Sequence, residues 1–126
     1  YDRLHTAELV EHLESASEVV FDLVAAADVL IYVGDLAALF PLVRRRVRSG
    51  ALFGFSVEEI DGDGYALRDS GRYGHSRAYI ESLARDNDFE VVSDTDLALR
   101  SAGQTAPALA LMERALIRLA MLGRAR

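Results

Sequence analysis

The sequence predicts an α/β domain in which a mostly parallel sheet is flanked by helices. Apolar, strand-like runs at residues 21–27, 51–57 and 89–92 alternate with helix-like segments, which favours right-handed crossovers between parallel strands. The run at 21–27 is nearly continuously apolar, a pattern typical of a strand buried on both faces. Asp28 follows it directly, and open α/β sheets bind their ligands at the carboxyl ends of strands.

The composition is that of one folded domain. Of its 126 residues, 51% are hydrophobic, which favours a filled core over disorder. The net charge of −6 opposes nonspecific binding to nucleic acid. The chain has no cysteine, which fits a reducing compartment, and its longest apolar stretch is too short to span a bilayer. We therefore expect one cytoplasmic domain over residues 1–126, without nucleic-acid or membrane partners.

The first elements are a strand end and a helix. Residues 4–7 predict the end of a short strand, and residues 9–14 predict a helix that turns Leu9, Val10 and Leu13 inward.

A second helix is expected after the apolar strand. Asp35 is a suitable N-cap, and Ser49-Gly50 would end the helix. Its apolar face comprises Leu36, Leu39, Phe40, Val43 and Val47. A basic cluster near its end is expected to stay solvated and to complement the helix dipole; it comprises Arg44, Arg45, Arg46 and Arg48.

The middle of the chain predicts a strand over residues 51–57, with Glu58 at its carboxyl end. Residues 61–74 are polar and glycine-rich and predict a loop. Ser76 is expected to cap a helix that runs to about Asp86. Its packing residues would be Tyr79, Ile80 and Leu83.

The C-terminal segment allows two interpretations. Residues 108–113 predict a short strand that pairs back on residues 97–100, with a helical tail from about residue 114. Apolar residues at helical spacing predict one continuous helix instead; they are Leu109, Met112, Leu116, Leu119 and Leu122. The strand is slightly favoured.

Three segments of the chain follow one another in the order of a known pattern. FDLVAAADVLIYVGDLAALF (21–40) and SGALFGFSVEE (49–59) resemble the fourth and fifth strands of class I S-adenosylmethionine-dependent methyltransferases. SGRYGHSRAYIESLARDNDFEVV (70–92), with its Gly-Arg-Tyr-x-His-Ser core, is similar to bacterial methyltransferases that are often fused to tetratricopeptide repeats. The resemblance implies a Rossmann-like fold and S-adenosylmethionine as cofactor, and it leaves the methyl acceptor open.

The chain also departs from the family. Class I methyltransferases hold the cofactor with a glycine-rich loop after the first strand and an acidic residue after the second, and this sequence contains neither feature upstream. We therefore expect a domain that is truncated at its N-terminal cofactor-binding half and binds the cofactor weakly alone. Its expected partner is a second copy or the upstream half of the same protein. The alternative is a non-catalytic remnant that uses an exposed sheet edge for oligomerisation or partner binding.

The resemblance implies several cofactor contacts. Ala26, Ala27 and Asp28 would lie beside the cofactor, with Asp28 next to its methionine moiety and the substrate, where a carboxylate could orient a nucleophile or balance the sulfonium charge. Alternatively, Asp28 accepts hydrogen bonds from loop amides at the strand end. Glu8 would contact the adenine edge, or it is an acidic residue favoured by the start of a helix.

The remaining candidates concern the acceptor. Tyr32 would line the same pocket, or it belongs to the core. His75, expected in the glycine-rich loop, would act as a base or bind substrate, or it is an ordinary loop histidine. Arg72 and Tyr73 are substrate-binding candidates with the same alternative.

No metal site is expected. His5 and His12 lack the close spacing of a helical metal pair. In the Asp61-Gly-Asp63 segment, Ala66 and Arg72 stand where a calcium loop needs glycine and glutamate.

Overall fold

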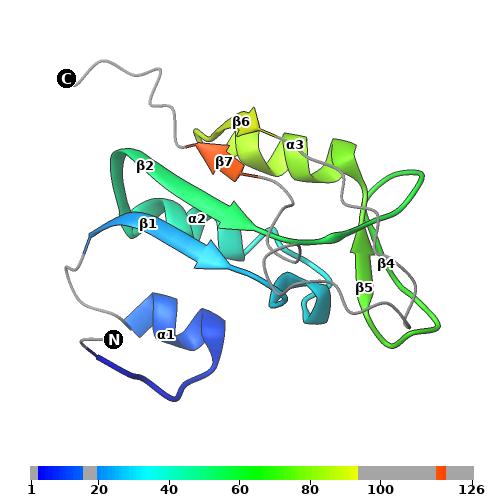
Figure 1. Ribbon diagram of the computed structural model, residues 1–126, viewed down its shortest axis with the longest axis horizontal. Coiled ribbons are helices and arrows are strands. Elements are labelled where there is room, and N and C mark those ends of the chain that lie inside the picture. Colours follow the sequence, from blue (N-terminus) through cyan, green and yellow to red (C-terminus); the bar gives the residue numbers. More distant parts are fainter. Residues whose placement is uncertain (1–2, 16–19, 94–115, 119–126) are drawn as a thin grey trace, which may run out of the picture.

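A computed structural model describes residues 3–15, 20–93 and 116–118, and all structural statements below concern these residues (Figure 1). The elements in chain order are α1 (Leu9–Ser15), β1 (Phe21–Ala26), the 3-10 helix η1 (Leu30–Tyr32), α2 (Leu39–Arg45), β2 (Val47–Phe55), β3 (Glu58–Glu59), β4 (Tyr65–Leu67), β5 (Tyr73–His75), α3 (Arg77–Asp86), β6 (Glu90–Ser93) and β7 (Leu116–Arg118). Strands and helices alternate along much of the chain, which confirms the predicted α/β class.

The strands form two sheets. The larger sheet has the order β1-β2-β7-β6, and the smaller has the order β3-β5-β4. In the larger sheet β1 and β2 are parallel, but β7 is antiparallel to both β2 and β6. The expected mostly parallel sheet is therefore wrong for the described residues. The reason is that β7 enters between β2 and β6 in the opposite direction, from a segment predicted to be helical.

The core is built around Phe40, which is fully buried. Its ring makes edge-on contacts with Phe53, Phe55 and Phe89, at centroid distances of 5.6, 5.9 and 5.8 Å. Such T-shaped pairs add to the stabilisation from burial alone. The five apolar positions predicted for the second helix face are all buried, although Leu36 precedes α2 and Val47 belongs to β2.

Strand β1 is not buried on both faces as predicted. It is an edge strand of the described sheet, and its side chains of Phe21 and Leu23 are 44% and 56% exposed. Only Val24 and Ala26 of this strand pack against the core. Figure 1 shows β2 beside β1. Among the described residues, β1 has no second neighbouring strand.

Helix α2 is shorter than predicted, because it begins later and ends earlier along the chain. The Asp35 carboxylate accepts a hydrogen bond from the Ala37 amide at 2.9 Å and so closes a turn before the helix, whose N-cap is Ala38. The helix ends at Arg45, and residues 47–50 already belong to β2. An apolar residue at position 47 fits both the helical spacing and the first position of a strand, so periodicity alone misplaced this boundary.

The basic cluster is less solvated than expected. The Arg46 guanidinium is half-buried and donates from Nε and Nη2 to the Leu13 carbonyl oxygen, at 3.1 and 2.8 Å. This contact ties the end of α2 to the last turn of α1. Arg48 forms an exposed ion pair of 2.8 Å with Asp22 of β1, and such exposed pairs contribute little stability.

Three further predictions of secondary structure can be compared with the structure. Helix α3 is confirmed, because the Ser76 hydroxyl accepts a hydrogen bond from the Tyr79 amide at 3.2 Å as its N-cap. Residues 4–7 form no strand. The predicted loop at 61–74 contains β4 and most of β5, which pair antiparallel; strands of three residues leave too short a pattern to recognise.

The C-terminal prediction is tested at three residues only. Residues 97–100 and 108–113 lie outside the described residues, so the strand predicted there stays a prediction. Residues 116–118 form β7, where the helical tail was expected, so the tail is wrong at these positions. The reason is tertiary: the segment pairs with β2 and β6.

Candidate functional site at the carboxyl end of β1

The parallel strands β1 and β2 end on the same side of the sheet. The turn at residues 27–29 and η1 follow β1 at this end, and the smaller sheet follows β2 (Figure 1). Two hydrogen bonds join the strand ends: the Ser56 amide donates to the Ala26 carbonyl at 3.3 Å, and the Asp28 amide donates to the Ser56 hydroxyl at 2.9 Å. The predicted ligand end of the sheet therefore has a defined backbone geometry.

Asp28 is exposed and its backbone is left-handed, with φ +54°. Aspartate adopts this region more readily than most residues because its short polar side chain tolerates it. Its carboxylate makes no hydrogen bond or ion pair with any described residue. The alternative in which Asp28 accepts bonds from loop amides is therefore not what the structure shows, since Ser56 secures the turn instead. The carboxylate is open to a ligand.

Three further predicted residues lie in the same short segment as Asp28. Ala26 is half-buried and ends β1, whereas Ala27 is exposed in the turn. Tyr32, at the end of η1, is 64% exposed, so it does not belong to the core. These residues are close to Asp28 because the chain is continuous, and their small or exposed side chains leave this turn accessible.

His75 lies on β5 and is 1% exposed, so its predicted position in a loop is wrong. Its Nε2 atom is 2.9 Å from the carbonyl oxygens of both Val33 and Gly34. Because carbonyl oxygens only accept, Nε2 carries a proton and donates to both. Its Nδ1 atom is buried and has no hydrogen-bond partner among the described residues. The ring tethers the segment after η1, and a role as a base stays a prediction.

Tyr79 of α3 is a site residue that sequence reasoning assigned only to packing. Its hydroxyl donates to Asp35 Oδ1 at 2.9 Å and accepts from the Leu36 amide at 3.0 Å. Burial, helped by the neighbouring Asp35, raises the pKa of Tyr79 to about 12, so the hydroxyl stays protonated near neutrality. The Ala37 amide, and then Tyr79, lower the pKa of Asp35. The sequence feature that could have indicated this role is a tyrosine on the apolar face of a helix, because a buried hydroxyl needs a hydrogen-bond partner.

Arg72 and Tyr73 make contacts within the fold. The Arg72 guanidinium lies 3.4 Å from one oxygen of Glu58, whose other oxygen binds Arg68 at 2.8 Å. Tyr73 is half-buried and lies against Gly34, where an added Cβ would be 2.7 Å from the tyrosine Cε1. Tyr73 begins β5 of the smaller sheet, and Arg72 directly precedes that strand. The predicted contacts of both residues with substrate stay predictions.

Glu8 caps α1. Its carboxylate accepts a hydrogen bond of 2.9 Å from the Glu11 amide, and the amides of Glu11, Val10 and Leu9 lower its pKa. This geometry agrees with the alternative in which Glu8 is an acidic residue favoured by the start of a helix, since Glu8 directly precedes α1. No hydrogen bond or ion pair joins Glu8 to the turn after β1 among the described residues. A contact with adenine stays a prediction.

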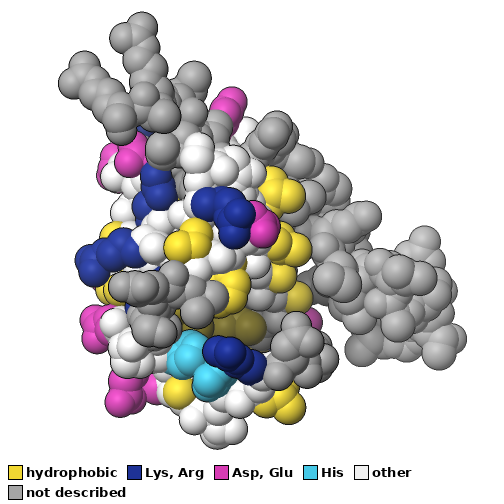
Figure 2. All heavy atoms as spheres, turned by 90° about the vertical axis from the view of Figure 1, so that its left-hand side faces the viewer, with side chains coloured by type: hydrophobic (Ala, Val, Ile, Leu, Met, Phe, Trp, Pro, Cys, Tyr) yellow, Lys and Arg dark blue, Asp and Glu magenta, His cyan; other side chains and the backbone are white. Residues whose placement is uncertain are grey.

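The histidines of the N-terminal segment lie together. The rings of His5 and His12 are 5.0 Å apart, and Figure 2 shows a histidine patch beside a basic side chain on this face. Across the described residues, no group of three or more His, Cys, Asp or Glu side chains is placed to hold a metal ion. None of the described helices is long and apolar enough to cross a membrane.

Comparisons with known proteins relate this geometry to a fold. No family model and no curated protein matches the chain. Among solved structures it is similar to the 1,6-didemethyltoxoflavin-N1-methyltransferase of Burkholderia thailandensis, solved with 1,6-didemethyltoxoflavin and S-adenosylhomocysteine. The TM-score is 0.52 at 18% identity, over 84% of this chain and 45% of that one. For the N-methyltransferase NodS of Bradyrhizobium japonicum WM9, the TM-score is 0.44 at 19% identity, over 84% and 53%.

The chain thus spans about half the length of the solved structures that it matches. At such low identity the likeness to the first of them bears on the fold and not on the activity. It supports the Rossmann-like expectation. The chain has an α/β fold similar to part of a methyltransferase.

Proposed function

We propose that this chain is part of an S-adenosylmethionine-dependent methyltransferase domain, with its site at the turn after β1. The observation that carries the proposal is the exposed carboxylate of Asp28, which has no partner among the described residues. It stands at the carboxyl end of a parallel strand, where α/β sheets bind ligands. The similarity to a methyltransferase solved with S-adenosylhomocysteine supports the choice of cofactor.

The residues at this turn suit a cationic donor. The bound cofactor would supply an already reactive methyl sulfonium, so the protein's task is to position the reactants and to exclude water. Asp28 would balance the positive charge, and Ala27 would let the backbone approach the ligand. Tyr32 offers an exposed aromatic face, which attracts cations.

Two finer proposals rest on the sequence alone. The Gly71-Arg72-Tyr73 start of the Gly-Arg-Tyr-x-His-Ser core supports a relationship to methyltransferases associated with tetratricopeptide repeats. The lack of cysteine supports a cytoplasmic location.

The chain alone is expected to bind S-adenosylhomocysteine weakly. The family's glycine-rich cofactor loop does not occur in this sequence. We therefore expect a Kd in the high-micromolar to millimolar range, which corresponds to a free energy of binding of about 4 to 6 kcal/mol in magnitude. A titration of the ¹⁵N-labelled chain by NMR measures this affinity. The largest shift changes should fall on the amides of residues 26–34. Shift changes confined to other elements, or sub-micromolar binding, would show that the pocket is misplaced.

A second candidate function is partner binding through the edge of β1. Peptide groups alternate in direction along a strand, so those of β1 that face away from β2 have no strand partner among the described residues. Val20, which precedes β1, and Phe21 and Leu23 of β1 are 43%, 44% and 56% exposed. Unprotected edges recruit strands from other chains. We propose that a second copy, or the upstream half of the same protein, occupies it.

Leu23→Lys is expected to reduce self-association of the chain. A lysine on an edge strand opposes strand addition, and Leu23 is too exposed to contribute much to the core. Light scattering over a concentration series should show a dimer or larger species for the unmodified chain and a shift towards monomer for the variant. Leu67→Lys is the control, because Leu67 is 62% exposed on β4 of the other sheet. A monomer at every concentration would argue against the second copy.

A further inference from the structure

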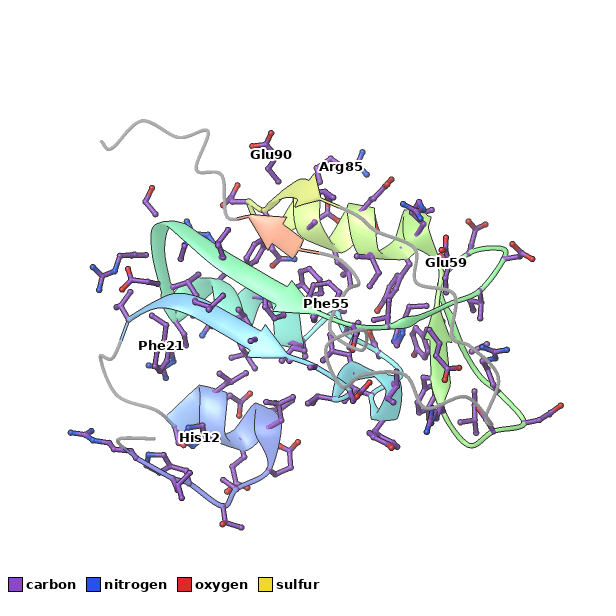
Figure 3. All side chains as sticks on the ribbon, in the orientation of Figure 1. His12, Phe21, Phe55, Glu59, Arg85 and Glu90 are labelled. Carbon is purple, nitrogen blue, oxygen red and sulfur yellow. The ribbon has the colours of Figure 1, made fainter. Side chains whose placement is uncertain are left out.

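Side chains from β5 and α3 hold the segment that follows η1. His75 donates from Nε2 to the carbonyls of Val33 and Gly34, and the Tyr79 hydroxyl bonds to Asp35 and to the Leu36 amide. The partners in these four contacts are separated by 41 to 44 residues in the sequence. Figure 3 labels Phe55 at the carboxyl end of β2 and Phe21 at the opposite end of β1. Strand β5 contacts η1, which follows the carboxyl end of β1. The contacts therefore lie at the proposed site's end of the sheet.

Close packing restricts the same segment to one position. A Cβ added at Gly34 would lie 2.7 Å from the ring of Tyr73 and 3.0 Å from that of Tyr65. Leu36, two residues later, is fully buried. Interiors packed this closely do not deform continuously. The segment can leave this position only if the rings move and the carbonyls of Val33 and Gly34 lose their donor.

The other end of the loop is held separately. The Ser56 hydroxyl accepts the Asp28 amide at 2.9 Å, so residues 28–36 are attached at both ends. Leu30 and Ile31 are buried between these attachments, whereas Tyr32 is exposed. In the part of the chain that the structure describes, the conformation that presents Asp28 and Tyr32 to solvent is thus held by backbone groups and by other side chains, and not by the carboxylate of Asp28 or the hydroxyl of Tyr32.

We propose that His75 and Tyr79 are positioning residues of the methyl-donor site. They hold residues 33–36 and thereby keep the loop, with Asp28 and Tyr32, in one binding-competent geometry. This inference rests on the proposed function for its ligand. If the loop is released, the affinity falls in proportion to the fraction of molecules that keep the competent conformation.

Tyr79→Phe and His75→Leu test the proposal in the complete 126-residue chain. We expect each to raise the amide exchange rates of residues 28–36 and to weaken the binding of S-adenosylhomocysteine about fivefold, as a fall of the competent fraction to about one fifth requires. His75→Gln keeps a donor near the position of Nε2 and should restore both readouts towards the original. Tyr65→Phe is the matched control, because the Tyr65 ring packs in the same cluster while its hydroxyl makes no hydrogen bond among the described residues.

The outcomes separate this inference from the proposed function. Unchanged amide exchange of residues 28–36 in Tyr79→Phe overturns the positioning role. An unchanged affinity for S-adenosylhomocysteine in a variant whose loop amides exchange faster overturns it as well. If the unmodified chain binds no ligand while exchange rises in the variants, the donor-site function fails and the holding of the loop stands. Equal effects of Tyr65→Phe and Tyr79→Phe would show general packing and overturn the specific role of the hydroxyl. If His75→Leu does not fold, Tyr79→Phe decides.

Discussion

Asp28→Asn is expected to lower methyl transfer about a hundredfold, roughly 2.7 kcal/mol of transition-state stabilisation, in a protein that joins this chain to a donor-binding half. Asparagine keeps the shape of the side chain and tolerates the left-handed backbone at φ +54°. The carboxylate has no partner to lose among the described residues. The melting temperature should therefore stay unchanged, with a stability difference within about 0.5 kcal/mol.

The measurement pairs the melting temperature with methyl transfer on the same preparations. Asp22→Asn is the control, since Asp22 is the second residue of β1, is exposed and pairs with Arg48. It should leave turnover unchanged. Unaltered turnover in Asp28→Asn would remove Asp28 from the site and leave Tyr32 and His75 as candidates. If the unmodified joined protein transfers no methyl group, partner binding becomes the better account.

Phe40→Ala is expected to destabilise the fold by about 3–5 kcal/mol, the usual cost of removing a buried phenylalanine. Phe40 is fully buried and contacts three other phenylalanine rings. The rings come from β2 and from the residue before β6, so the cavity would loosen the packing of α2 on the larger sheet. Since the free energy of unfolding of a domain is commonly only about 5–15 kcal/mol, this single substitution removes a large part of it.

Denaturant unfolding of the purified chain measures the effect. Phe21→Ala is the matched control, because Phe21 is 44% exposed on the edge strand and should cost about 1 kcal/mol or less. Phe40→Leu keeps most of the volume and supplies a measurable variant if Phe40→Ala does not fold. Similar losses for Phe21→Ala and Phe40→Ala would contradict the placement of the core.

Elements specified by local chemistry were predictable from the sequence. The hydroxyl of Ser76 caps α3 because it sits directly before the helix and reaches the Tyr79 amide. The apolar spacing around Phe40 located a buried helix face, and apolar runs located β1, β2 and β6 to within a few residues. The position of Asp28 after a strand could likewise be foreseen, since it follows from the order of residues along the chain.

The sequence did not determine which strands become neighbours. The apolar pattern of β1 predicted burial, yet burial depends on which segments lie beside a strand, and in the described residues β1 has one neighbour. The direction of β7 depends on its pairing with β2 and β6. Short strands such as β4 are formed by pairing with a partner, and three residues carry too little periodicity to reveal them.

The same division holds at the candidate site. The sequence by itself placed Asp28 and Tyr32 after a strand and marked His75 as a residue of interest. Only the tertiary structure decided that Asp28 is exposed, that Ser56 secures its turn, and that His75 and Tyr79 hold the loop. The physical reason is distance along the chain: hydrogen bonds between groups about forty residues apart form only when packing has brought β5 and α3 against the loop, and no local pattern encodes that approach.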